Sequence, residues 1–235
     1  MARAAWRFRW RVEREAAARF SRLASQLARV GAASSVVDLA ARAASDEERH
    51  AVLCAEQAAK CGERLVPRGP VRLAEITPKG LLLRGRVLYE VVASCCITET
   101  ESMGVLTTLL GSVRDAEMRR VLRQLAEDEV GHSRLGWAHL ASEHAQGTTA
   151  FLSPLIPSML AGNAPADLFS PAPELADEEE TLLEHGVLPH RLKREVFIRI
   201  LEDVVFPGLE TFGVDAGPAR SWLATRRATL SRGAG

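Results

Sequence analysis

Several residue types that mark particular classes of protein are scarce in this chain. Its four cysteines, Cys54, Cys61, Cys95 and Cys96, include no C-x-x-C pair. This argues against a zinc ribbon, a rubredoxin site or a disulfide scaffold, and free thiols in a reducing cytoplasm are the simpler interpretation. The single tyrosine, Tyr89, disfavours a role that needs a stable tyrosyl radical.

Long apolar runs and an excess of charge are also missing. No apolar stretch approaches the length that spans a bilayer, so we expect no membrane partner. Lys and Arg together number 30, as do Asp and Glu, so the formal net charge is zero. This balance argues against a general nucleic-acid binder. The Arg-rich N-terminus faintly resembles a transit peptide, but it contains glutamates, and we interpret it as a helix of a cytoplasmic protein.

What the sequence does contain is typical of an all-α protein, because Ala, Leu, Arg and Glu dominate and β-branched runs are short. The glycines, prolines and apolar periodicity predict four long helices separated by a short turn, a long crossover and a second short turn. This connectivity is typical of an antiparallel four-helix bundle with one long crossover. The four helices are predicted at residues 4–30, 34–61, 79–111 and 113–145, with the crossover at 63–78.

The remaining residues predict a helical extension of this bundle. Residues 147–175 are rich in Pro, Gly and Ser and predict an irregular arm. A short helix should follow from residue 177, then a longer one bent near Pro207, and a last one over 217–232. We therefore expect a bundle domain over 1–146 and a helical C-terminal extension over 147–235 that packs on it.

Two pairs of residues repeat one spacing on the second and fourth predicted helices. Glu47 and His50 lie three residues apart, as do Glu129 and His132. Residues at this spacing share a helix face, so each pair could bind one metal ion. A carboxylate with an imidazole suits iron, manganese or zinc. Each pair alone is a weak signal, since exposed polar residues on a helix would give the same pattern.

The first and third predicted helices offer the further carboxylates that a dimetal bundle needs. Glu13 is in line with small and apolar residues, and Glu99 is the acid nearest the middle of the longest apolar stretch. Glu15 and Glu101 are the alternatives. Two residues turn a helix by about 200°, so we expect only one member of each pair to face inward. Two divalent cations would neutralise four buried glutamates that would otherwise repel one another.

This order of Glu, ExxH, Glu and ExxH on four successive helices resembles the ferritin-like diiron superfamily, which includes rubrerythrin and bacterioferritin. The stretches DEERHAVLCAEQ, SCCITET and LAEDEVGHSRLGWAHL resemble bacterial ferritin-like domain proteins, over about residues 5–145. Rubredoxin-type cysteine pairs are missing, unlike in a complete rubrerythrin. The resemblance implies that two metal ions are bridged by Glu47 and Glu129. It implies the ligands Glu13, Glu47, His50, Glu99, Glu129 and His132.

By the same resemblance we expect two iron ions, with manganese or a mixed Mn/Fe pair as alternatives. The expected activity is an O2- or peroxide-dependent oxidoreductase with an unknown small-molecule substrate and electron donor. An iron-binding or ferroxidase storage protein is the first alternative, and a non-catalytic helical interaction module is the second. A homodimer is compatible with the sequence.

Several neighbours of these residues have simpler explanations. We expect Asp128 and Glu127 to be solvated, with a hydrogen bond from a ligand imidazole as the alternative. The cysteines near the pairs are expected to be small core residues rather than redox groups. Gly131 and Gly136 interrupt the fourth helix, which suggests a close helix contact or space for a substrate. The other four histidines are expected at the surface or in packing.

Overall fold

The computed structural model describes residues 1–67, 69–165, 167–170 and 176–232, and every regular element in these ranges is a helix. The predicted all-α class is therefore confirmed. None of the helices in this part of the chain is long and apolar enough to cross a membrane.

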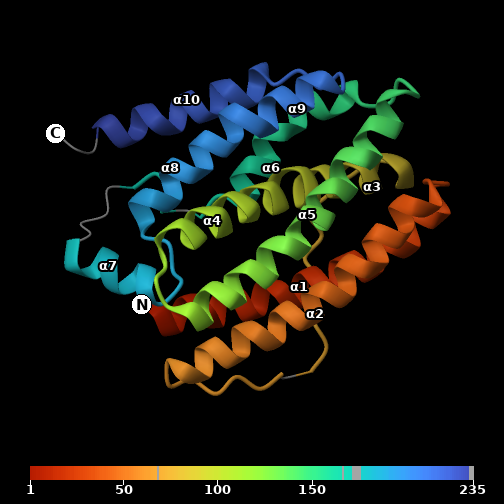
Figure 1. Ribbon diagram of the computed structural model, residues 1–235. Coiled ribbons are helices and arrows are strands. Elements are labelled where there is room, and N and C mark those ends of the chain that lie inside the picture. The colour runs from red at the N-terminus through yellow and green to blue at the C-terminus, as the bar shows by residue number, and fades with distance from the viewer. Residues whose placement is uncertain (68, 166, 171–175, 233–235) are drawn as a thin grey trace.

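The first two long helices form a hairpin. Helix α1 (Ala2–Arg29) and helix α2 (Ser34–Lys60) lie side by side and run in opposite directions (Figure 1). Gly31, with φ of 74°, makes the turn between them. Helix α2 begins at Ser34, and Ala33 precedes it without a side-chain hydrogen bond.

The third predicted helix is interrupted by a change of helix type. It begins at Leu83, four residues later than predicted, and comprises α3 (Leu83–Val91), the π-helix η1 (Val92–Thr98) and α4 (Glu99–Ser112). A π-helix bonds each residue to the fifth along rather than the fourth, so it shifts the faces of the residues that follow. Such segments occur often at functional sites.

Helix α5 (Ala116–His144) returns along α4 and is capped by Asp115, whose carboxylate accepts a 2.7 Å hydrogen bond from the backbone N–H of Met118. It approaches η1 very closely at Gly136. A Cβ at this position would lie 2.6 Å from the Cβ of Cys95 and 2.9 Å from its backbone carbon. The predicted close contact is confirmed for Gly136, whereas a Cβ at Gly131 would meet nothing within 4 Å.

The predicted irregular arm is partly wrong, because two helices form within residues 150–163. They bury Leu152, Ile156 and Leu160. Pro157 lies at the start of α6, where the missing N–H costs little, whereas Pro154 lies inside η2. Residues 171–175 of that arm lie outside the described ranges. The two helices are the 3₁₀-helix η2 (Ala150–Leu155) and the α-helix α6 (Ile156–Asn163).

The last three predicted helices form close to their predicted positions. The irregularity expected near Pro207 is a π-helix immediately before that proline. The elements are α7 (Ala176–Glu184), α8 (His190–Ile200), η3 (Leu201–Val205), α9 (Phe206–Thr211) and α10 (Gly217–Arg232).

These C-terminal helices pack on one side of the unit formed by α1, α2, the α3–η1–α4 segment and α5. Phe197 of α8 belongs to the same buried apolar cluster as Val92 and Ile97 of η1. Gly104 of α4 leaves room for the side chain of Ile200, which would lie 2.6 Å from an added Cβ. The indole N–H of Trp6 donates a 2.9 Å hydrogen bond to the carbonyl of His185. The extension thus covers η1 and α4 and reaches the N-terminal end of α1.

Candidate metal centre

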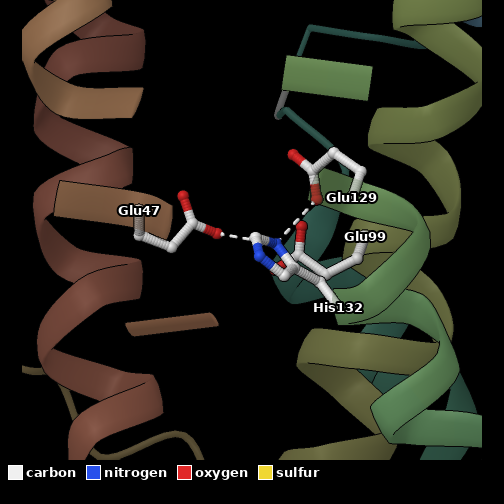
Figure 2. A group of neighbouring side chains, drawn as sticks. All are labelled: Glu47, Glu99, Glu129 and His132. Carbon is white, nitrogen blue, oxygen red and sulfur yellow. Dashed lines mark hydrogen bonds and ion pairs between the residues drawn. The ribbon is translucent and has the colours of Figure 1, made fainter. Parts of the chain in front are cut away.

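The structure brings the six predicted ligands together between the long helices. Their candidate ligand atoms form two groups, and within each group these atoms lie within 4.8 Å of one another. Glu47 belongs to both groups, and Figure 2 shows the larger one between α2 on one side and α4 and α5 on the other. The groups are Glu47, Glu99, Glu129 and His132, and Glu13, Glu47 and His50.

The two ExxH pairs have the geometry that their spacing predicted. His50 Nδ1 lies 3.1 Å from Glu47 Oε2, and His132 Nδ1 lies 3.1 Å from Glu129 Oε2. His132 Nδ1 also lies 3.2 Å from Glu47 Oε1, which joins the pair on α2 to the pair on α5. All four side chains are buried. The alternative interpretation, that the two pairs are exposed polar residues on helix surfaces, is therefore wrong.

Each imidazole also contacts the aspartate that directly precedes the other ExxH pair in the sequence. His50 Nε2 lies 3.1 Å from Asp128 Oδ2, and His132 Nε2 lies 3.3 Å from Asp46 Oδ2. Arg49 donates to both aspartates, at 2.6 Å and 3.2 Å. Asp128 therefore has the hydrogen-bonding role that we had held as the alternative, and the expectation that it is solvated is wrong.

Asp46 was missed entirely, although the sequence contains a signal for it. Both motifs read D-E-x-x-H, with Asp46 and Asp128 directly before the metal-ligand candidates. A residue one place earlier on a helix turns away by about 100°, so it leaves the centre and reaches the neighbouring helix. The repeated aspartate could have been found by comparing the two motifs.

These contacts determine which imidazole nitrogen could bind a metal. An Nε2–H that donates to Asp46 or Asp128 leaves Nδ1 as the ring atom directed at the carboxylates. A carboxylate behind a ligand histidine orients the ring and raises its basicity. The structure therefore offers Nδ1 of His50 and His132 as the two nitrogen ligands.

The carboxylates of this cluster lack a permanent counter-charge. Burial raises the pKa of Glu99 well above its usual range, and the charges of Glu129 and Glu47 add to this. Burial, Glu47 and Glu129 likewise raise the pKa of Glu13, although Arg9 lowers it. Within the described ranges, no lysine or arginine nitrogen lies within 4.0 Å of these four carboxylates.

Without a bound metal, the histidines share protons with the carboxylates through hydrogen bonds. Burial lowers the pKa of His132, but hydrogen bonds to Glu129 and Glu47 outweigh it and raise the pKa overall. The pKa of His50 is raised in the same way, through Glu47. Burial raises the pKa of Glu47, but its bonds from both histidines outweigh this and lower it. A bound cation would displace these protons, and it would replace the hydrogen bonds between the histidines and the glutamates.

The choice of Glu13 over Glu15 follows from the arrangement around α1. Glu13 belongs to the cluster. The side chain of Glu15 is 42% exposed and pairs with Arg11 at 4.0 Å, and although it lines the cavity it does not join the cluster.

For Glu99 and Glu101, the argument that only one can face inward is wrong. Both are buried, and both line the same cavity. Glu101 Oε2 accepts a 2.9 Å hydrogen bond from Asn163 Nδ2 of α6. The C-terminal extension therefore buries the face of α4 that a bare bundle would leave in water, while Glu99 alone joins the cluster.

The buried cysteines behave as core residues. Burial raises the pKa of the Cys54 and Cys95 thiols well above their ordinary value, so both stay protonated. Cys54 Sγ donates a long 3.9 Å hydrogen bond to Glu13 Oε1. A protonated thiol is a poor nucleophile and a poor metal ligand, which favours the packing role over a redox role.

A cavity of about 710 Å³ opens onto the carboxylate side of the cluster. Most of its wall comes from α1, from η1 and α4, and from α6, and the loop before α8 and the start of α8 also contribute. Glu13, Glu47, Glu99 and Glu129 line it, whereas His50 and His132 do not. A small molecule in this space would meet the carboxylate side of a bound metal, opposite the imidazoles.

Comparison with protein-family models, with curated proteins and with solved structures finds no significant match.

Proposed function

We propose that this chain binds two divalent metal ions, iron in the first place, and uses them for O2- or peroxide-dependent oxidation of a small molecule. The observation that carries this proposal is the convergence of four glutamates and two imidazoles, with no lysine or arginine of the described residues in direct contact with the carboxylates. Burying so many acids is costly, and two divalent ions would offset their charge.

The two ligand groups support a division of roles. His132 and Glu99 would hold one ion, and His50 and Glu13 would hold the other. Glu47 belongs to both groups, so it would be a ligand of both ions, and Glu129 is proposed as the second shared ligand on its place in the ExxH motif. Oxygen and imidazole donors of this kind suit Fe(II), and they suit Mn(II) equally well.

Iron in such a site would supply the electrons that reduce O2 or peroxide. The chain's own residues would orient and enclose this chemistry. Asp46 and Asp128 hold the imidazole rings by their Nε2–H groups. Ser102 donates a 3.0 Å hydrogen bond to Glu129 Oε1, which orients that carboxylate. The cavity would hold the substrate on the open side.

The arrangement of helices supports a ferritin-like four-helix bundle as the finer description of the fold. The hairpin of α1 and α2 packs beside the pair of α4 and α5, and each of these four helices supplies at least one proposed ligand (Figure 1). The cavity beside the cluster favours a substrate larger than a metal ion, and therefore favours an oxidase over an iron store. A non-catalytic module would need neither the cavity nor the acids.

The first test is the metal content of protein reconstituted anaerobically with Fe(II), measured by mass spectrometry. The wild type should hold about two irons per chain, and Glu99→Ala and His132→Ala should hold fewer. Glu101→Gln is the matched control, because it removes a charge from the same cavity outside the cluster, and it should keep both irons. A wild type without stoichiometric metal, with iron and manganese both offered, would refute the proposal.

Reaction with O2 is the second test. Mixing the diferrous protein with oxygenated buffer should oxidise the iron much faster than free Fe(II) in the same buffer. An iron-loaded protein that oxidises no faster than free Fe(II) would leave a metal-binding protein without the proposed activity.

A further inference from the structure

The cavity beside the cluster carries charges that the proposed metal centre does not use. Two cationic side chains line it apart from the ligands and the ion-paired Arg19, namely Arg9 of α1 and Lys193 of α8. They come from parts of the chain that are 184 positions apart in number and meet across the same space. Their environments indicate what the cavity accepts.

Arg9 has a donor with nothing to bind. Its Nη1 atom is buried and has no hydrogen-bond partner among the described residues. The guanidinium carbon lies 5.2 Å from the ring centroid of Trp6, which holds the group in place. A buried charged donor without an acceptor is unfavourable, and a planar guanidinium matches the two oxygens of a carboxylate. The side chain of Arg9 lines the cavity, so its guanidinium lies at the wall that an entering anion would meet.

Lys193 is half-buried, and no carboxylate of the described residues lies within 4.0 Å of its ammonium. Its charge acts on Glu101 from a longer distance. Glu101 in turn accepts the hydrogen bond from Asn163. Lys193 and Glu101 thus face the same cavity as a separated pair of opposite charges.

The charge balance of the loaded site then selects the ligand. Two divalent ions would neutralise the four clustered glutamates, and Glu15 and Arg19 have their own partners, Arg11 and Glu90. Among the described residues, the charges left facing the cavity are the cations Arg9 and Lys193 and the anion Glu101. One positive charge is in excess, and a bound monoanion would neutralise it.

The walls define the rest of the ligand. Apolar side chains from several parts of the chain line the cavity, so they suit an apolar body rather than a sugar or a peptide. We infer that the cavity binds a small organic monocarboxylate, with its carboxylate at Arg9 and its apolar body beside the metal centre. This inference rests on the proposed function, because metal-free glutamates would repel the anion. The apolar lining includes Val12, Phe20, Val105, Met159 and Leu188.

The test is calorimetric titration of anaerobic Fe(II)-loaded protein with 4-phenylbutanoate and with its neutral isostere 4-phenylbutanamide. Iron content is measured on the same samples. The carboxylate should bind the wild type roughly tenfold or more tightly than the amide. Arg9→Gln should weaken carboxylate binding by about 10- to 100-fold, bind the amide as before and keep both irons.

Three further variants separate the role of Arg9 from a general effect on α1. Arg7→Gln removes an arginine of the same helix that pairs with Glu63 and does not line the cavity, so it should bind the carboxylate as the wild type does. Arg9→Lys should restore part of the preference. Lys193→Gln, on another helix, should reduce the preference less than Arg9→Gln does, and it keeps the test available if Arg9→Gln fails to fold.

The outcomes distinguish this inference from the proposed function. Protein that holds two irons but binds the amide as tightly as the carboxylate overturns the inference and leaves the metal centre standing. Two irons with unchanged carboxylate binding in Arg9→Gln also overturns it, since the anion would then bind the metal directly. A wild type without iron overturns the proposed function and this inference together.

Discussion

The two halves of the candidate metal centre supply matching residues from differently built helices. The half on α1 and α2 provides Glu13, Glu47 and His50 from a regular α-helical hairpin. The half on α4 and α5 provides Glu99 and the second ExxH pair, and Glu99 directly follows the π-helix η1. Equivalent donors are therefore presented by backbones with different hydrogen-bonding patterns.

The surroundings of the two outer glutamates differ as well. Glu13 is half-buried, and its nearest compensating charge is Arg9, one turn away on the same helix. Glu99 is only 7% exposed, and its pKa is raised chiefly by burial, with His132 as the one cationic influence. The two glutamates therefore have unlike electrostatic costs, so the two metal positions should differ in affinity.

The largest expected effect distinguishes the shared ligand from the outer ones. Glu47 belongs to both ligand groups, so Glu47→Ala should lower the metal content from about two ions per chain to nearly none. Glu13→Ala and Glu99→Ala should each retain about one ion, because each belongs to a single group. Mass spectrometry of the reconstituted variants measures this. One retained ion in Glu47→Ala would contradict the bridging role.

The next effect concerns the crossed aspartates. Asp128→Asn and Asp46→Asn change the groups that hold the His50 and His132 rings, so metal affinity should fall about 10- to 100-fold in each. Competition with a chelator measures the affinities. Asp167→Asn is the control, because its side chain lies outside the cluster. Equal metal affinity in all three variants and the wild type would remove the aspartates from the proposed site.

The stability of the metal-free protein should change less, and there the loss of a cluster glutamate should be favourable. Since the pKa of Glu99 is raised on folding, its carboxyl costs stability as the pH rises from 4.5 toward the folded value. Glu99→Gln should therefore raise the free energy of unfolding by about 1–3 kcal/mol at pH 7. Glu13→Gln should gain less, because Arg9 already offsets part of that charge.

Urea denaturation of the metal-free variants measures this difference at pH 7 and again below pH 4.5. The gain should vanish at the lower pH, where the carboxyl is protonated in both folded and unfolded chains. A Glu99→Gln variant less stable than the wild type at pH 7 would show that the buried carboxylate is compensated in a way that the structure does not contain.

The smallest expected signal is the proton release on metal binding. The pKa values of Glu13, Glu99, His50 and His132 are all raised, so each can hold a proton that a metal ion must displace. Up to about four protons per chain should be released near neutral pH, and metal affinity should fall as the pH falls. A pH indicator in weakly buffered solution measures this. Release that is unchanged in Glu99→Gln would contradict the assignment of one proton to Glu99.

Much of the helical architecture follows from local sequence signals. Gly31 and Gly62 end the first two helices close to the predicted positions because both adopt positive φ, which other residues rarely do. The shared face of each ExxH pair followed from its spacing, whereas the convergence of the two pairs was implied by their order on four helices and its resemblance to ferritin-like proteins. That the convergence binds metal stays a prediction.

The missed features depend on contacts between distant parts of the chain. No residue type in the sequence marks the π-helix η1, and its backbone is constrained by Gly136 of α5. The inward position of Glu101 could not be predicted, because its partner Asn163 lies 62 residues away. The helices at 150–163 were missed because their prolines and glycine suggested a loop, whereas tertiary burial of Leu152 and Leu160 stabilises them.

The approach of α5 to η1 also limits which substitutions the chain can accept. At Gly136 the obstacle to any side chain is the backbone of Cys95 and Cys96, which cannot rotate away as a side chain can. Alanine, the mildest replacement, meets the same obstacle as tryptophan. No substitution of Gly136 is therefore conservative. At Gly131, only five positions earlier on the same helix, alanine would be accommodated freely.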